Sequence, residues 1–167
     1  MPKEIHLQSQ STKEKELKFE LVKDEDKYPY DLLLLADETI QSIHEYVFKS
    51  EVFVVRSNEE EIGAFCLYKT DQDTVELKNV AVARPLQSKG IGTQIIDYIK
   101  QYLKNQKYRT LVVGTADIGI RQIKFYEKNG FLKYDMRQNF YVENYEKPIF
   151  EDGVQLKDMV LLKYQLQ

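Results

Sequence analysis

The six residues from Gln87 to Gly92 read Gln-Ser-Lys-Gly-Ile-Gly, a composition that suits a loop that binds an anion. Gly90 and Gly92 have no Cβ atom, so several backbone N–H groups can turn toward a single anion there. A helix that begins at this point would direct the positive end of its dipole toward the same anion. Lys89 and Arg84 add cationic charge beside the loop. The sequence therefore predicts a binding site for a diphosphate group.

The chain on either side of this loop has the patterns of a strand and a helix. Residues Val75–Val82 form a nearly continuous apolar run, which is typical of a strand buried on both faces. Pro85 ends this strand, because proline has no N–H group to donate within a sheet. Ile91–Lys104 carries isoleucines and a leucine at helical spacing on one face. The loop is therefore expected at the junction of a buried strand with an amphipathic helix.

Two common phosphate-binding motifs do not fit this loop. A P-loop requires Lys-Ser/Thr after its last glycine, but Thr93 and Gln94 follow Gly92. A dinucleotide fingerprint requires a third glycine, and position 95 is Ile95. The stretch instead resembles the acyl-CoA-binding motif of the GNAT N-acetyltransferases, which is Gln/Arg-x-x-Gly-x-Gly/Ala after a buried strand. Every fixed position of that motif is matched between Gln87 and Gly92.

A second stretch, Phe125–Phe131, resembles the Tyr-Glu-x-x-Gly-Phe string that follows the CoA site in many GNAT enzymes. The resemblance implies that Tyr126 is the group that protonates the departing CoA thiolate. Leucine or phenylalanine would serve packing as well at this position, which favours a role for the hydroxyl. The chain departs from the family at Gly119, where many relatives carry an asparagine that contacts the cofactor. A nearby polar residue, Thr115 or Asp117, could compensate.

The resemblance also implies an acetyl-CoA site that needs no metal. In GNAT enzymes the central strand bulges and splays from its neighbour, which frees backbone groups for the pantetheine arm of the cofactor. The residues that the resemblance assigns to acetyl-CoA are Val80, Ala81, Val82, Gln87, Ser88, Lys89, Gly90, Ile91, Gly92 and Thr93.

Glu76 is the candidate for the base that takes a proton from the attacking amine. It lies inside an otherwise apolar strand, where a carboxylate has to be paired or take part in chemistry. Histone-type GNAT relatives carry a glutamate at the matching position. A salt bridge to Lys78 or to a lysine on another strand is the structural alternative, and many GNAT enzymes use only water to take this proton.

The resemblance implies an α/β GNAT fold: a mixed, mostly antiparallel sheet of six or seven strands, about four helices, and a split between strands 4 and 5. Residues 1–16 are polar and are expected to form a mobile tail or a short edge strand, before an acetyltransferase domain at 17–167. Asp37 is the predicted N-cap of a helix that continues to Phe48. The other predicted strands are at 17–23, 52–56, 62–69, 110–114, 131–137 and 156–164, the other helices at 29–35 and 118–129, and a long aromatic loop at 138–153.

Composition limits the compartment and the partners. With 167 residues, of which 43% are hydrophobic, the chain can form one domain with a sizeable core. No apolar run is long enough to span a membrane, and no leader resembles a signal peptide. Cys66 is the only cysteine, so no internal disulfide is expected and a cytoplasmic location is favoured. The net charge of -3 argues against nonspecific nucleic-acid binding, while a homodimer is compatible with everything in the sequence.

The acceptor is expected to be a small cationic amine. Segments 24–38 and 138–153 are rich in Asp and Glu, and the second also carries Phe140, Tyr141 and Tyr145. Acidic and aromatic groups attract cations through charge and cation–π contacts. We therefore predict an N-acetyltransferase that moves an acetyl group from acetyl-CoA to a primary amine, with a protein N-terminus or lysine as the other acceptor class. A CoA-binding sensor without turnover is the alternative function.

Overall fold

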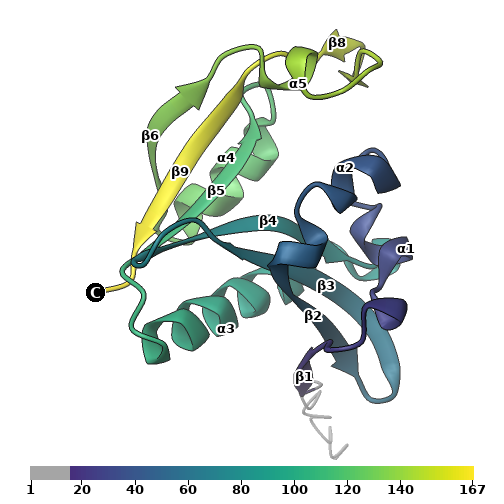
Figure 1. Ribbon diagram of the computed structural model, residues 1–167, viewed down its shortest axis with the longest axis vertical. Helices are drawn as coiled ribbons and strands as arrows, with labels where there is room; N and C mark the ends of the chain where they lie inside the picture. Colours follow the sequence, from purple (N-terminus) through teal and green to yellow (C-terminus); the bar gives the residue numbers. More distant parts are fainter. Residues whose placement is uncertain (1–15) are drawn as a thin grey trace, which may run out of the picture.

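The protein, seen as a computed structural model that describes residues 16–167, contains one seven-stranded mixed sheet (Figure 1). The strands lie in the order β1-β2-β3-β4-β5-β9-β6, and every neighbouring pair is antiparallel except the parallel pair β4 and β5. A separate ribbon pairs β7 with β8. The strands are β1 (Leu17–Leu21), β2 (Ser50–Ser57), β3 (Glu60–Lys69), β4 (Thr74–Val82), β5 (Thr110–Ala116), β6 (Leu132–Arg137), β7 (Phe150–Glu151), β8 (Val154–Gln155) and β9 (Met159–Gln165). The predicted fold class is confirmed, whereas the tail predicted at residues 1–16 lies, except for its last residue, outside the described residues.

Two long helices cover one face of the sheet and two short helices cover part of the other. The core under the long helices α3 and α4 includes Ile95, Ile99 and Ile123. On the opposite face, Leu33 and Ile43 of α1 and α2 pack over β2 and β3. The helices are α1 (Tyr30–Leu33), α2 (Ile40–His44), α3 (Ile91–Asn105), α4 (Ile120–Lys128) and α5 (Phe140–Glu143), with single 3-10 turns η1 (Glu25–Lys27), η2 (Val47–Lys49) and η3 (Arg84–Leu86).

The start of α2 differs from the prediction. Thr39 is the N-cap, because its side-chain oxygen accepts a hydrogen bond from the backbone N–H of Ser42. Asp37 lies two residues further back and directs its carboxylate to other partners. The helix also ends earlier than predicted, at His44, and Phe48 in the following 3-10 turn is 48% exposed. The predicted aromatic loop at 138–153 is likewise interrupted, by α5 and the β7–β8 ribbon.

The sheet splits between β4 and β5, as predicted. These strands pair only from Thr74–Leu77 on β4, opposite Thr110–Val113 on β5. Beyond Leu77, β4 continues with β3 and β5 continues with β9, so the two halves of the sheet diverge (Figure 1). The divergence begins at a β-bulge, since Leu77 lies opposite Leu67 and Asn79 lies opposite Cys66. In the described chain, therefore, no strand pairs with the edge of β4 that faces β5 after Leu77.

Two further features of the described residues concern membrane-spanning helices and Cys66. No helix between residues 16 and 167 combines the length and the apolar character that crossing a bilayer requires. Cys66 is fully buried in the core beneath α1 and α2, and burial raises the pKa of its thiol to about 12. The thiol is therefore protonated at neutral pH and behaves as a small core group rather than as a nucleophile.

Candidate active site

The predicted anion-binding loop leads into the first turn of α3. Gly90 is the N-cap of this helix and adopts a left-handed conformation, with φ of 83°, that residues with a side chain rarely adopt. No side chain caps the helix. The N–H groups of Ile91, Gly92 and Thr93 therefore have no intrahelical acceptor and are available to an anion.

Two other loop residues have structural tasks that the sequence did not reveal. The side-chain amide of Gln87 donates a hydrogen bond of 2.9 Å to the carbonyl of Val82, which ties the loop to the end of β4. At Gly92 a Cβ atom would lie 3.2 Å from Cζ of Phe125, so glycine permits α3 and α4 to approach closely. Glycine is thus needed at position 90 for the left-handed backbone conformation, and at position 92 for the close packing of α3 against α4.

A cleft of about 640 Å³ occupies the region where β4 and β5 diverge. Its floor comes from both strands, its inner wall from α4, and its cover from the segment after α1 together with aromatic residues of the 138–156 region. The residues that line it include Leu34, Asp37, Lys78, Asn79, Val80, Arg84, Gln87, Gly114, Thr115, Gly119, Gln122, Tyr126, Tyr141, Tyr145 and Leu156. The cleft therefore reaches from the split in the sheet to Gln87 in the loop before α3.

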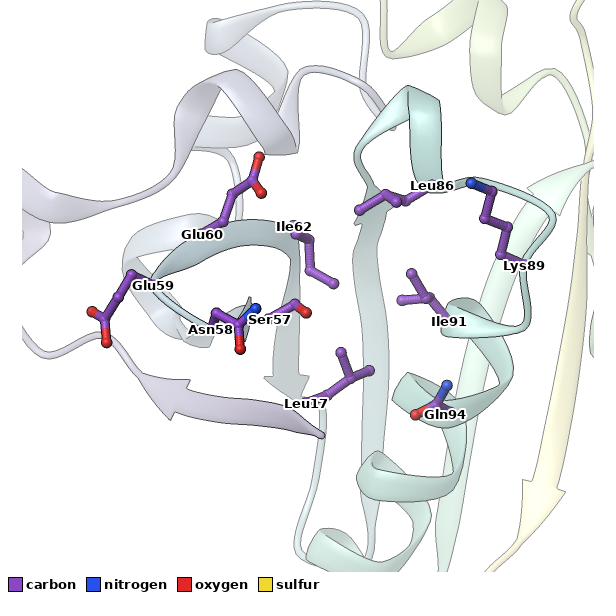
Figure 2. A pocket seen from close by; sticks show the side chains of 10 residues that line it. All are labelled: Leu17, Ser57, Asn58, Glu59, Glu60, Ile62, Leu86, Lys89, Ile91 and Gln94. Atoms are coloured by element: carbon purple, nitrogen blue, oxygen red, sulfur yellow. The ribbon is translucent and has the colours of Figure 1, made fainter. Parts of the chain in front are cut away.

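The side chains of Lys89 and Ile91 do not line this cleft. Their side chains line a different cavity, of about 650 Å³, between the start of α3 and the turn that joins β2 to β3 (Figure 2). Its other walls include Leu17 and Ile62, and it shares no lining residue with the cleft. Any contribution of Ile91 to cofactor binding must therefore come from its backbone.

Tyr126, the predicted acid, lies on α4 at the wall of the cleft. Its ring is buried and packs edge-on against Phe125 and Phe131, with ring centroids 5.2 Å and 5.4 Å away. Burial raises the pKa of Tyr126 above its ordinary value, so the hydroxyl keeps its proton at neutral pH.

Gly119 caps α4, at the position where many relatives carry asparagine. A Cβ atom there would lie 3.1 Å from both the carbonyl of Ala116 and the side-chain oxygen of Gln122, and 3.6 Å from the hydroxyl of Thr115. Gln122 and Thr115 line the cleft and lie where a longer side chain at 119 would start. The sequence singled out Thr115 but gave no sign of Gln122.

Glu76, the predicted base, is 5% exposed and lies in β4 just before the bulge. Its carboxylate lies 3.2 Å from Nζ of Lys78 and 3.7 Å from a guanidinium nitrogen of Arg137 on β6. The ion pair with Lys78 was the structural alternative in the sequence, and the partner from β6 is new. Two cations therefore offset the cost of burying this carboxylate.

Glu76 faces a second cavity, of about 530 Å³, on the side of the sheet that carries α2. This cavity shares Asp37, Lys78, Gly114, Tyr141 and Tyr145 with the cleft, so the two spaces adjoin. Acidic and aromatic residues dominate its wall: Asp37, Glu45, Tyr46, Tyr68, Glu76, Phe140, Tyr141, Glu143 and Tyr145, against the cations Lys78 and Arg137. A cationic acceptor would find favourable charge there.

Asp37 links the two segments that cover the cleft. One carboxylate oxygen accepts a hydrogen bond of 3.0 Å from the hydroxyl of Tyr46, and the other accepts one of 3.1 Å from Tyr145. Asp37 and Tyr145 are 108 residues apart in sequence. Burial, and then the charge of Asp37, raise the pKa of Tyr145. Nothing in the sequence could pair these residues, because the contact depends on two loops that meet across the split.

Metal chemistry has no evident site in the part of the chain that the structure describes. No group of three or more His, Cys, Asp or Glu residues between 16 and 167 is arranged to hold a metal ion.

Comparison with known proteins identifies the family. The model of the acetyltransferase (GNAT) family matches residues 14–131, which include the loop, the split and Tyr126. The chain belongs to the GNAT acetyltransferase family. The uncharacterized N-acetyltransferase YvbK of Bacillus subtilis is 35% identical over 150 residues, which cover 90% of this chain and 97% of the relative. As the sequence predicted, this GNAT protein is an acetyl-CoA-dependent acetyltransferase.

Solved structures agree on the fold and on the cofactor. A GNAT acetyltransferase from Elizabethkingia anophelis with acetyl-CoA bound is 38% identical, with a TM-score of 0.85 over 89% of this chain and 97% of that one. A Bacillus subtilis acetyltransferase in complex with CoA is 35% identical, with a TM-score of 0.82 over 91% and 100%. An IAA acetyltransferase from Bacillus cereus is 31% identical, with a TM-score of 0.83 over 90% and 99%. The free N–H groups of α3 and the split in this GNAT protein fit the same cofactor.

The two glycines of the loop should respond differently to valine. Gly90→Val cannot keep a left-handed φ without strain, so the loop should rearrange and acetyl-CoA affinity should fall about tenfold or more. Gly92→Val should push against Phe125 and lower the melting temperature as well. Gly153→Val is the control, because Gly153 has a similar φ of 79° but lies in the β7–β8 turn. Calorimetry that shows wild-type affinity in folded Gly90→Val would place the anion elsewhere.

Tyr145→Phe should loosen the cover of the cleft, since it removes one hydrogen bond to the Asp37 carboxylate. A bond of this kind contributes about 1 kcal/mol, so amide hydrogens in residues 140–149 should exchange about fivefold faster. Tyr141→Phe is the matched control, because its ring stacks on Tyr145 but Asp37 keeps both tyrosine partners. Equal exchange in the two variants would show that the Asp37–Tyr145 bond does not hold this segment.

Proposed function

We propose that this GNAT enzyme acetylates the primary amine of a small cationic acceptor that binds in the cavity beside Glu76. The observation that supports this acceptor class is the wall of that cavity, where Asp37, Glu45 and Glu143 stand among five aromatic side chains. Only Lys78 and Arg137 oppose them, and both lie within 4.0 Å of the Glu76 carboxylate. A cation entering the cavity would therefore meet net negative charge and aromatic faces.

The reaction requires a proton to leave the amine and another to reach the departing sulfur. An ammonium group has no free electron pair, so it must lose a proton before its nitrogen attacks the thioester carbonyl. The new C–N bond forms a tetrahedral intermediate with an oxyanion and a positively charged nitrogen. The nitrogen loses its second proton, and collapse of the intermediate breaks the C–S bond, which leaves the amide and the CoA thiolate. A proton from an acid then converts the thiolate to the thiol.

The unpaired edge of β4 is suited to stabilise the oxyanion. Backbone N–H groups in the stretch from Lys78 to Val82 have no strand partner on the side that faces β5. Because the bulge and the pairing with β3 hold this edge in place, an N–H group there needs no reorganisation when charge develops. We assign the backbone of Val80, Ala81 and Val82 to the cofactor arm, in line with the sequence prediction.

Tyr126 is the proposed general acid. Tyr126 lines the cleft, and no charged side chain is needed to keep its hydroxyl protonated, because burial raises its pKa. A phenol that retains its proton at neutral pH can donate to a nearby thiolate as the C–S bond breaks.

Glu76 is the proposed base, acting directly or through a water molecule. It is the most deeply buried carboxylate on the wall of the acceptor cavity. Lys78 and Arg137 partly offset the negative charge of the Glu76 carboxylate, and its oxygens remain close to the cavity. The proton of the amine could pass to this carboxylate and from there to solvent.

The acceptor class can be tested by thiol release from acetyl-CoA over a panel of amines. Small diamines and other cationic amines should be acetylated with higher kcat/KM than neutral aromatic amines of similar size. Glu143→Gln, which removes one charge from the cavity wall, should raise KM for cationic amines and leave acetyl-CoA affinity unchanged. A preference for neutral or anionic acceptors would refute the proposed class.

Tyr126→Phe should separate acid catalysis from packing. The ring stays and only the hydroxyl is lost, so kcat should fall roughly ten- to a thousandfold while acetyl-CoA affinity stays nearly the same. Because burial raises the pKa of Tyr126, the wild-type rate should not decline on the alkaline side below about pH 10. Tyr164→Phe is the control, since Tyr164 packs on Phe131 outside the cleft. An unchanged kcat in Tyr126→Phe would mean that water protonates the thiolate.

Glu76→Gln should change the acidic limb of the pH–rate profile. If the carboxylate takes the proton, the group that titrates on that limb is absent in the variant, and the slope of log rate against pH should change. Arg137→Gln is the matched control, because it breaks the 3.7 Å ion pair but keeps the carboxylate. Lower melting temperatures in both variants with an unchanged acidic limb would show that Glu76 acts only in the ion pairs.

A further inference from the structure

Asn79 is a buried polar residue to which the mechanism above gives no task. It follows the bulge in β4 and is only 4% exposed. Its side-chain nitrogen donates two hydrogen bonds, one of 2.9 Å to the carbonyl of Leu33 and one of 3.0 Å to the hydroxyl of Tyr46. Both donor positions of the amide are therefore in use on the side of α1 and η2.

The hydrogen-bond network fixes which way this amide points. The carbonyl of Leu33 can only accept, so it requires the nitrogen. The hydroxyl of Tyr46 gives its single proton to Asp37, so toward Asn79 it too must accept. A flipped amide would place oxygen against both acceptors. The side-chain oxygen Oδ1 of Asn79 therefore has to point away from Leu33 and Tyr46.

That oxygen is left without a donor. Among residues 16–167, no N–H or O–H group reaches Oδ1 of Asn79, and it is the one buried side-chain polar atom in the described chain of which this is true. Buried acceptors are nearly always hydrogen-bonded, because leaving one unpaired forfeits its interaction with water. The observation points to a donor on a ligand, and Asn79 lines the cleft between β4 and β5.

We propose that Oδ1 of Asn79 accepts a hydrogen bond from an amide N–H of the pantetheine arm of acetyl-CoA. The inference rests on acetyl-CoA as the substrate of this family and on the cleft as its site. Asn79 lines the cleft together with Val80 and Tyr126 but does not line the acceptor cavity beside Glu76. We therefore expect the donor to Oδ1 of Asn79 to be an N–H group of the cofactor arm and not the acceptor amine.

The diphosphate of the cofactor carries no N–H, whereas the pantetheine arm carries amide N–H groups. If Asn79 contacts only this arm, substitution of Asn79 should lower the affinity for CoA but not the affinity for a ligand that lacks the arm. The compound 3′,5′-ADP has the adenosine, the 3′-phosphate and the first of the two 5′-phosphates of CoA but no pantetheine, and serves as that ligand.

The test measures binding of CoA and of 3′,5′-ADP by calorimetry. Asn79→Ala should weaken CoA about three- to thirtyfold and change 3′,5′-ADP by less than about twofold. Retained 3′,5′-ADP binding also shows that the variant is folded at the loop. If Asn79→Ala does not fold, Asn79→Ser replaces it, because serine supplies a hydroxyl donor on the side of the Leu33 carbonyl.

Tyr46→Phe is the matched control. It breaks the bond from the side-chain nitrogen of Asn79 to Tyr46, and also the bond from Tyr46 to Asp37, but leaves Oδ1 and the contact with Leu33 in place. CoA affinity should therefore stay within about twofold of wild type in this variant. Equal loss of CoA affinity in Tyr46→Phe and Asn79→Ala would overturn the proposal. Weaker 3′,5′-ADP binding in folded Asn79→Ala, or unchanged CoA binding with a raised KM for the amine, would overturn it as well.

Discussion

The architecture of this protein depends on a limit of backbone pairing: after Leu77, β4 has a strand on one side only. Pairing with β3 continues through Val82, and β5 keeps its full pairing with β9, so both strands remain anchored on their outer edges while their inner edges separate. The bulge opposite Cys66 and Leu67 starts the separation. An open edge inside a sheet is costly unless something else pairs with it. A cofactor arm that carries amide groups is a natural occupant, and the rest of the site is placed around that gap.

Segments that are far apart in the sequence meet around the gap between β4 and β5. α3 begins after the loop that follows β4, and Arg84 and Gln87 of that connection line the cleft. α4 follows β5 and presents Tyr126 and Gln122 to the same space. On the open side, the α1–α2 connection and the segment around α5 lie across from each other (Figure 1) and are joined by the hydroxyl of Tyr145 and the carboxylate of Asp37.

The two carboxylates of the site, Glu76 and Asp37, are stabilised by different kinds of partner. Glu76 could not remain buried without partners, and the structure supplies Lys78 from its own strand and Arg137 from β6. Asp37 is stabilised differently, by two tyrosine hydroxyls and the N–H of Glu38. Because Asp37 is paired by neutral donors, its negative charge is not cancelled, which leaves it available to attract a cation. The two carboxylates therefore differ in what they offer to an acceptor.

Local patterns in the sequence determined much of this. The apolar run of β4, the glycines before α3 and the helical spacing after them are local features, and they predicted the strand, the loop and the helix in the right places, while anion binding by the loop stays a prediction. Glu76 was selected because it stands out from its apolar neighbours, and Tyr126 because it matches a family motif. The structure places Glu76 on the wall of the acceptor cavity and Tyr126 on the wall of the cleft, and their catalytic roles stay predictions. Tertiary structure alone decided the contacts between distant segments: Arg137 with Glu76, Asp37 with Tyr145, and the isolation of Oδ1 of Asn79. Asp37 shows why, because by sequence it is as good a helix cap as Thr39, and only the position of two tyrosines from other elements gives its carboxylate better partners. Sequence periodicity reports how a segment meets its own neighbours, whereas these contacts depend on how the chain is folded between them.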